Sequence, residues 1–444
     1  MDSGTDRVAS QLRMQRRRSK QRVIPRVAEV VIDSIGARGD GIAHLEGRPL
    51  YVPFSQAGDR LRVRLEAPRG EGLAARIVEV LAPGAGRVAP PCPQFGECGG
   101  CALQHIADGL YAEWKVAQLR TALARRGLAE LPLQPLVRVP PGTRRRAAMV
   151  AERTGGSVRL GFHARASHRV VDATGCLVLS PALMQLLPRL RDVLPSLLSE
   201  GERIDITATA AETGVDLLLS GRRPPALAQR EALARLATGA ALARVTWLAA
   251  GTPGEPIVLH RAAQMTFAGI RVDLPSGAFL QPTAEGESAL VRAVVEAMRE
   301  CRRVADLYSG VGTFTFPLAR NASVHAVEGD ADAAGALAAA GRRAMLGARV
   351  TAEQRDLAHD PLTVEELTRF DGVVFDPPRA GAKTQSEILA RSSVAAVVAV
   401  SCDPATFARD ARILVDGGYR MLSVTPIDQF LWSPHLEAVA VFQR

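Results

Sequence analysis

The stretch DLYSGVGTFTFPLA, residues 306–319, joins an apolar strand to a helical segment through Gly310 and Gly312. Glycines at such a junction let a ligand press against the backbone beside the start of a helix. A dinucleotide-binding fingerprint would have its third glycine at position 315, where this chain has Thr315. The stretch therefore favours S-adenosylmethionine over NAD as the bound nucleotide.

The same strand-and-helix pattern recurs from about residue 303 onwards. Five apolar strands, each followed by a loop and a helical stretch, are predicted in RVADLYSGVG, SVHAVEGD, ARVTAEQRD, DGVVFDPPRAG and VAAVVAVSCDP. Two more strand candidates, YRMLSVTPID and LEAVAVFQ, close the chain in a hairpin that is typical of methyltransferase sheets. The pattern predicts an α/β fold, a doubly wound Rossmann-like sheet with its site at the C-terminal ends of the strands.

Acidic residues follow these strands. Glu328 is placed to accept hydrogen bonds from both ribose hydroxyls of the nucleotide, and Asp356, one strand further, is placed to meet the adenine edge.

In FDPPRAG, 375–381, amino-group methylases have an asparagine and an aromatic residue where this chain has Asp376 and Arg379. A carboxylate accepts from the N3–H of uracil but would face the lone pair of cytosine N3. The motif therefore favours uracil over cytosine as the methylated base. The alternative is that the motif has only a structural role, as a turn made rigid by its two prolines.

Cys402, in VSCDPATFARD, is a candidate nucleophile. It ends an apolar strand just before a helix in which Asp403 is the expected N-cap and Pro404 lies in the first turn. The amides and dipole at the start of this helix should favour a thiolate at Cys402. The alternative role, a buried structural cysteine, fits Cys301 better than Cys402. Asp403, however, adds a negative charge beside that thiolate, which should oppose the helix effect.

The chemistry of uracil explains why a thiolate is needed. C5 is too electron-poor to take a methyl group directly, but a thiolate that adds at C6 gives C5 carbanion character. A base must then remove the C5 proton so that the thiolate can leave. Glu437, in SPHLEAVAVF, is the candidate base and His435 the second choice.

Three further cysteines lie within PPCPQFGECGGC, residues 90–101. Cys92, Cys98 and Cys101 need a fourth soft ligand for a closed metal site, and Cys176 is free to supply it. Four thiolates suit zinc or an iron-sulfur cluster, and the spacing alone leaves the two equally open.

The 444-residue chain has a net charge of +9, which comes almost entirely from arginine because lysine occurs only at positions 20, 115 and 383. Arginine pairs with phosphates and stacks on bases, so a polyanion is the expected partner, although an arginine-rich proteome would give the same composition. No apolar run approaches the roughly 20 residues that cross a bilayer, and no signal core precedes the first domain. We therefore expect a cytoplasmic protein without membrane contact.

Four regions are predicted along the chain. Residues 1–23 form a basic disordered tail, and the short strands of 24–84 suggest a small OB-like β-barrel. A central α+β domain, 85–265, has a helix over 106–128 and basic antiparallel strands over 144–176. The methyltransferase sheet occupies 266–444.

From about residue 25 to its end, the chain resembles the RNA (uracil-5-)-methyltransferases. The signatures, in the family's order, are CPQFGECGGCALQH, FLQPT, DLYSGVGTFTFPLA, FDPPRAG, SCDPATFARD and HLE. This chain departs from the family at three points. Thr313, which we assign to the cofactor site with Gly310 and Asp356, stands where the family often has asparagine. Asp403 replaces the asparagine of SCNP, and HLE replaces HVE.

The resemblance implies a nucleotide-binding role for Gln281, Tyr308, Glu328 and Asp376, the nucleophile at Cys402 and the base at Glu437. It identifies the N-terminal barrel as similar to a TRAM domain, an RNA-binding module. It also favours a [4Fe-4S] cluster on Cys92, Cys98, Cys101 and Cys176, because larger members of the family have one at these positions.

We therefore expect S-adenosylmethionine-dependent methylation of uridine C5 in structured RNA by a monomeric enzyme. A barrel together with a cluster resembles the 23S rRNA enzymes more than the tRNA enzyme, so 23S rRNA is the expected substrate and tRNA the alternative. The rival hypotheses are a noncatalytic RNA-binding protein on the same fold and a cytosine methylase. A radical S-adenosylmethionine enzyme fits less well, because its usual cysteine spacing is missing.

Overall fold

The computed structural model describes residues 26–130 and 132–444, so the predicted basic tail lies outside the described part of the chain. The chain divides into two compact units. The first ends at Ala89 and also includes His105–Ala107, and the second comprises Pro90–Gln104 and Asp108–Arg444. The domain boundaries expected at residues 84 and 265 stay predictions.

A six-stranded sheet forms the first unit, in the order β1-β5-β6-β4-β3-β2. Side chains of β5 alternate between an apolar core and an outer face that presents Arg60, Arg62 and Arg64. The sequence did not predict β3, because the buried positions of that strand are the small residues Gly41 and Ala43. Closure into a TRAM-like barrel stays a prediction. The strands are β1 (Val27–Val31), β2 (Ser34–Ile35), β3 (Gly41–Leu45), β4 (Arg48–Val52), β5 (Arg60–Arg69) and β6 (Gly72–Ala82).

The second unit contains a seven-stranded sheet in the order β10-β9-β8-β11-β12-β13-β14. Helices α3 (Pro181–Leu197) and α4 (Leu227–Gly239) pack against it through a leucine-rich core. The antiparallel strands predicted over 144–176 are confirmed as β8, β9 and β10. The strands are β8 (Arg146–Thr154), β9 (Ser157–His163), β10 (Val170–Asp172), β11 (Arg203–Ala211), β12 (Gly214–Gly221), β13 (Arg244–Ala249) and β14 (Glu255–Leu259).

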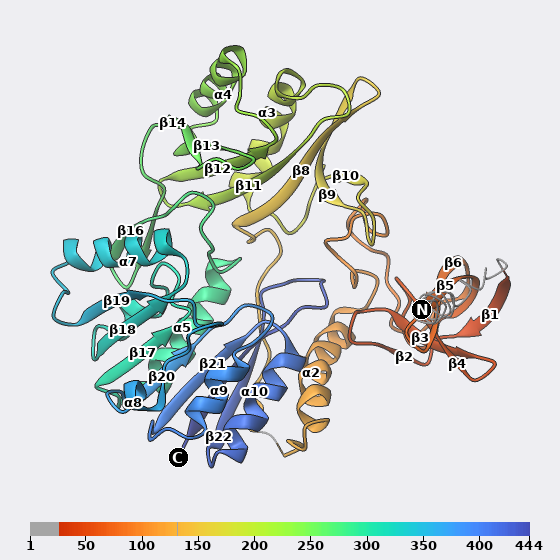
Figure 1. Ribbon diagram of the computed structural model, residues 1–444. Coiled ribbons are helices and arrows are strands. Elements are labelled where there is room, and N and C mark those ends of the chain that lie inside the picture. The colour runs from red at the N-terminus through yellow and green to blue at the C-terminus, as the bar shows by residue number, and fades with distance from the viewer. Residues whose placement is uncertain (1–25, 131) are drawn as a thin grey trace, which may run out of the picture. The chain divides into compact units, whose positions relative to one another are not determined.

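The predicted doubly wound sheet is also in this unit and has eight strands, in the order β19-β18-β17-β20-β21-β23-β22-β7 (Figure 1). The chain runs from β17 outwards to β19 and then returns to the other side of β17, where β20 pairs with it in parallel. The C-terminal ends of β17 and β20 therefore form the switch point, where ligands bind in such sheets. The strands are β17 (Arg303–Leu307), β18 (Ser323–Glu328), β19 (Val350–Gln354), β20 (Gly372–Phe375), β21 (Ala396–Ser401), β22 (Arg420–Asp428), β23 (Glu437–Gln443) and β7 (Val137–Arg138).

Helices cover both faces of this sheet (Figure 1). One core contains Leu290 of α5 and Leu337 of α7, and the opposite core contains Leu119 of α2 and Phe407 of α10. The predicted helix at 106–128 is confirmed as α2, although it begins at Asp108 and ends at Ala124. The helices are α2 (Asp108–Ala124), α5 (Ala284–Ala297), α6 (Thr315–Leu318), α7 (Ala331–Arg343), α8 (Val364–Leu367), α9 (Lys383–Leu389) and α10 (Pro404–Asp416), and a hairpin of β15 (Gln264–Phe267) and β16 (Ile270–Asp273) precedes α5.

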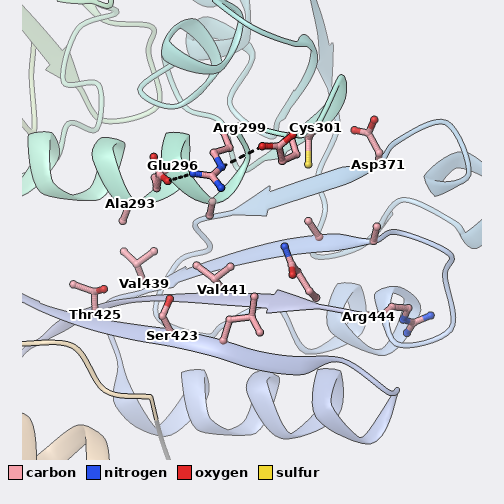
Figure 2. A pocket seen from close by; sticks show the side chains of 16 residues that line it. Ala293, Glu296, Arg299, Cys301, Asp371, Ser423, Thr425, Val439, Val441 and Arg444 are labelled. Atoms are coloured by element: carbon pink, nitrogen blue, oxygen red, sulfur yellow. Dashed lines mark hydrogen bonds and ion pairs between the residues drawn. The ribbon is translucent and has the colours of Figure 1, made fainter.

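A pocket of about 540 Å³ lies between α5 and the last strands of the sheet. Ala293 and Glu296 of α5 line one side of it, and Val439 and Val441 of β23 line the other (Figure 2). None of the residues that line it is a predicted site residue. Within the ranges that the structure describes, every helix is too short or too polar to cross a bilayer.

Candidate active site

The turn after β17 is tight and shaped by unusual backbone angles. Tyr308, Gly310 and Gly312 all have positive φ values, of 60°, 56° and 102°. A side chain at position 312 would begin 2.5 Å from the ring of Phe316, so only glycine fits there. The helix expected after this turn, α6, has only four residues. The predicted helix after the glycines is therefore present but short, and close approach of a ligand to the backbone of this turn stays a prediction.

Glu328, at the end of β18, faces this turn. Its carboxylate accepts a hydrogen bond from the amide of Gly310 at 2.7 Å and from the amide of Asp330 at 2.8 Å. Asp356 follows β19 and is mostly exposed, with an ion pair to His359 at 2.7 Å that lowers the pKa of the carboxyl. Thr313, on the same turn as Gly310, is partly buried. The structure thus brings Glu328 and Gly310 together and leaves the side chain of Asp356 on the surface.

Asp306, at the C-terminal end of β17, is a buried acid that the sequence reasoning did not single out. The hydroxyl of Thr315 donates to it at 2.6 Å, and burial raises the pKa of Asp306 to about 7. Its Oδ1 has no hydrogen-bond partner among the described residues. The sequence does contain a feature that could have indicated Asp306 as a site residue. It is an acid inside an otherwise apolar strand, directly before the glycine turn.

A chain of amide hydrogen bonds joins the two predicted acids of the site. Gln281 donates from Nε2 to Asp376 at 2.9 Å. Gln429, which follows β22, donates from Nε2 to Gln281 Oε1 and to Glu437 Oε2, both at 2.8 Å. The sequence reasoning missed Gln429, because its importance comes only from contacts with residues distant along the chain. Three predicted site residues, Gln281, Asp376 and Glu437, therefore lie in one network.

Both acids of this network are buried, which changes their ionisation. Burial raises the pKa of Asp376 to about 7. Burial and the charge of Asp376 raise the pKa of Glu437 to about 8. Each carboxyl therefore changes its protonation near neutral pH, the range in which a side chain works best as a catalytic base.

Cys402 lies between the end of β21 and the start of α10. The predicted N-cap is confirmed, because Asp403 accepts hydrogen bonds from the amides of Ala405 at 2.9 Å and Thr406 at 3.2 Å. The expected thiolate is not favoured by the surroundings of Cys402. Burial, followed by the charges of Glu437 and Asp376, raises the pKa of Cys402 to about 11. The side chain of Asp403 occupies the helix amides that would otherwise stabilise a thiolate.

Arg379 opposes this effect. Its guanidinium lowers the pKa of Cys402 and contacts the imidazole of His435. Burial and the charge of Arg379 lower the pKa of His435 to about 4, so this imidazole is neutral at physiological pH. The DPPR motif thus places one acid and one cation around the same thiol.

Known proteins are similar to this chain in sequence. The family model described as tRNA (Uracil-5-)-methyltransferase matches residues 264–444. An RNA methyltransferase of Caulobacter vibrioides is 43% identical over 94% of this chain and 100% of that protein. The 23S rRNA (uracil(1939)-C(5))-methyltransferase RlmD of Halomonas elongata is 34% identical over 94% of this chain and 89% of that protein. The chain belongs to the RNA (uracil-5-)-methyltransferase family.

A solved structure confirms the fold of this methyltransferase. The tRNA (uracil-54, C5)-methyltransferase of Pyrococcus abyssi, crystallised with S-adenosyl-L-homocysteine, aligns with a TM-score of 0.72 over 94% of this chain and 100% of that one. The identity of the two sequences is 22%, so the likeness concerns the fold. The predicted α/β methyltransferase architecture is confirmed. As a member of its family, the enzyme depends on S-adenosylmethionine.

The four clustered cysteines of the methyltransferase lie in a shared environment. Cys92, Cys98, Cys101 and Cys176 are free thiols, each partly buried. Burial and the neighbouring sulfurs raise the pKa of Cys98, and the same causes raise that of Cys101 to about 12. In the part of the chain that the structure describes, no group of three or more His, Cys, Asp or Glu side chains is arranged to hold a metal ion.

The backbone around the thiols is favourable to charged sulfur. Gly100 donates its amide to the sulfur of Cys98 at 3.4 Å, and the sulfur of Cys176 accepts from the amides of Val178 and Leu179. Burial nevertheless raises the pKa of Cys176, and these two amides and the guanidinium of Arg144 only partly oppose that rise. By donor type the four thiols suit a soft metal group, although among the described residues they are not arranged as a metal site.

Proposed function

We propose that this enzyme methylates C5 of a uridine in 23S rRNA by covalent catalysis at Cys402. The observation that supports the proposal most is the position of Cys402, whose ionisation responds to Glu437 and Asp376 together. In this proposal Cys402 is the nucleophile, Glu437 the base and Asp376 the acceptor for the uracil N3–H. A noncatalytic RNA-binding protein would not need this buried arrangement of titrating groups.

Recognition of uracil is assigned to Asp376 and Gln281. In its ionised form Asp376 accepts a hydrogen bond from the N3–H, and the side chain of Gln281 holds the carboxylate in place from the other side. Because the pKa of Asp376 is about 7, a hydrogen-bond donor at the site readily shifts the carboxyl to its charged form. A cytosine offers a lone pair at this position and is disfavoured.

Cys402 first gives its proton to solvent water and forms a bond to C6, and the electron pair of the C5–C6 double bond moves to C5 and the adjacent carbonyl. S-adenosylmethionine, when bound, supplies the methyl group that C5 takes. Glu437 then removes the proton from C5, the double bond forms again, and the thiolate leaves from C6. Arg379 stabilises the thiolate at the beginning and at the end of this sequence.

The cofactor is assigned to the turn after β17. Glu328, which already accepts from two amides, is placed for the ribose hydroxyls, and the backbone at Gly310 and Tyr308 permits close approach. Thr313 and Asp356 complete the proposed site. We add Asp306, because its free Oδ1 is a buried acceptor at the same strand end.

Two further parts of the proposal concern RNA binding. A [4Fe-4S] cluster would be held by Cys92, Cys98, Cys101 and Cys176. This cluster would stabilise the fold of the central domain and take no part in the chemistry. The sheet of the first unit would act as a TRAM-like RNA-binding module, supported by the exposed guanidinium groups of Arg60 and Arg64 on its outer face.

The choice of 23S rRNA rests on the Halomonas relative, which matches nearly the whole chain and is named for that substrate. A test is to incubate the purified enzyme with RNA from a deletion strain and to analyse the nucleosides by mass spectrometry. We expect 5-methyluridine in the large-subunit rRNA. Modification confined to tRNA would overturn the substrate, 5-methylcytidine would overturn the base, and no methylation would favour the noncatalytic alternative.

A further inference from the structure

Lys115, on α2, is a fully buried lysine outside the site described above. Its ammonium donates to Asp428 Oδ1 at 2.7 Å and to the carbonyl of Phe430 at 3.4 Å, and it also donates to the carbonyl of His435. These acceptors belong to one segment, residues 428–437, which runs from the end of β22 to the start of β23. We call this segment the base loop, because Glu437 is its last residue.

One ammonium therefore holds both ends of the base loop. Asp428 directly precedes Gln429, and His435 lies two residues before Glu437. Gln429 and Glu437 are themselves hydrogen-bonded at 2.8 Å, so the position of each depends on the loop between them. The ammonium group of lysine is a compact charge with three donors, so it can donate to acceptors that lie in three directions. The planar guanidinium group of arginine does not match such an arrangement. In a chain that otherwise uses arginine almost throughout, one of three lysines stands here.

Two neighbouring contacts hold the middle of the base loop. The hydroxyl of Tyr111, one turn before Lys115 on α2, donates to Asp428 Oδ2 at 2.5 Å and accepts from the amide of Trp432 at 2.8 Å. The carbonyl of Trp432 accepts from the amides of Ala102 and Leu103, at 2.8 and 3.1 Å. Ala102 directly follows Cys101, so the segment that carries the clustered cysteines contacts the base loop.

We propose that Lys115 is a positioning residue for the last chemical step, the removal of the C5 proton by Glu437. This inference rests on the proposed function of Glu437. A buried ammonium is costly unless its partners compensate it, and here the partners are the loop that presents the base. When the ammonium is missing, the carboxylate of Glu437 is no longer held at the distance that proton transfer requires.

The test uses Lys115→Met in the full-length enzyme with a uridine-containing rRNA fragment. Because proton removal follows methyl transfer, we expect the variant to accumulate methylated RNA bound to Cys402, visible on denaturing gels. A misplacement of about 1 Å can cost about 100-fold in rate, so kcat should fall about 10- to 100-fold while the KM for RNA does not rise. A lysine with only a structural role would lower the melting temperature without accumulating the adduct.

A second variant separates positioning from folding. Lys115→Met combined with Asp428→Asn removes both buried charges, which destabilises less than removal of one partner. We expect its melting temperature to recover towards that of the wild type, while adduct accumulation persists. Recovery of kcat together with stability would overturn the proposal. Arg120→Met, an exposed change on the same helix, is the matched control and should leave kcat and the adduct level unchanged.

Failure of this inference differs from failure of the proposed function. If Glu437→Gln accumulates the adduct and Lys115→Met does not, Lys115 does not position the base. If Glu437→Gln forms no adduct, the assignment of Glu437 itself is wrong, and the inference about Lys115 is wrong with it.

Discussion

The carboxyl group of Glu437 raises the pKa of the Cys402 thiol, which burial has already raised. Two negative charges on this pair are therefore disfavoured, and Cys402 keeps its proton at neutral pH. Glu437, the proposed base of the last step, thus disfavours ionisation of Cys402, the proposed nucleophile of the first step. This relationship leads to a prediction for each residue.

Glu437→Gln should make Cys402 more reactive before any RNA is bound, because it removes the negative charge that disfavours the thiolate. We expect alkylation of Cys402 by iodoacetamide at pH 8 to be faster in the variant than in the wild type. The measurement is quantitative mass spectrometry of the peptide that contains Cys402, with the peptide of Cys301 as internal control. Equal rates in both proteins would mean that the two groups do not interact.

With RNA and S-adenosylmethionine present, Glu437→Gln should arrest the reaction after methyl transfer. The thiol can still add to C6, but no carboxylate removes the C5 proton, so RNA stays attached to Cys402. The adduct should survive a denaturing gel, and its mass should include the methyl group. Cys402→Ala is the control and should form no adduct and no product while it still binds the cofactor. Normal turnover by Glu437→Gln would assign the proton to another base.

Much of the catalytic sheet could be predicted because strands such as β20 and β21 are short apolar runs, and because turn or acidic residues follow several of the strands. The order of these strands brings Asp376 and Cys402 to one edge, so their proximity also follows from the pattern. Lys115 and Gln429 could not be found in this way. Lys115 is 313 residues from Asp428 and Gln429 is 148 residues from Gln281, and neither position stands out by local composition. The helix start beside Cys402 is visible in the sequence, whereas the burial of this thiol and the nearby charges of Glu437 and Asp376, which raise its pKa, are not.

If Cys98 is a ligand of the proposed [4Fe-4S] cluster, Cys98→Ser should abolish that cluster while leaving the catalytic sheet folded, because the two cores that flank this sheet do not include the thiols. Purified anaerobically, the wild type should be brown and contain iron and acid-labile sulfide, and the variant should lose both. Cys301→Ser, which changes a cysteine outside the cluster, is the control and should stay brown. Stoichiometric zinc without sulfide in the wild type would contradict the assignment.

Asp376→Asn should change how the stability of the protein depends on pH. Burial raises the pKa of Asp376 from its usual 3.8 to about 7, so the folded protein binds this proton more tightly than the unfolded chain does. The stabilisation by the bound proton is therefore fully present below about pH 4 and is lost as the pH rises through about 7.

Asparagine cannot ionise, and its carbonyl can still accept the hydrogen bond from Gln281. Each pKa unit corresponds to about 1.4 kcal/mol, so the variant should gain stability over the wild type as the pH rises from 4 to 8. Thermal unfolding of both proteins across this range measures the difference, with Asp332→Asn, which changes an exposed acid of α7, as the control. A gap between Asp376→Asn and the wild type that stays constant with pH would show that folding does not raise the pKa of Asp376.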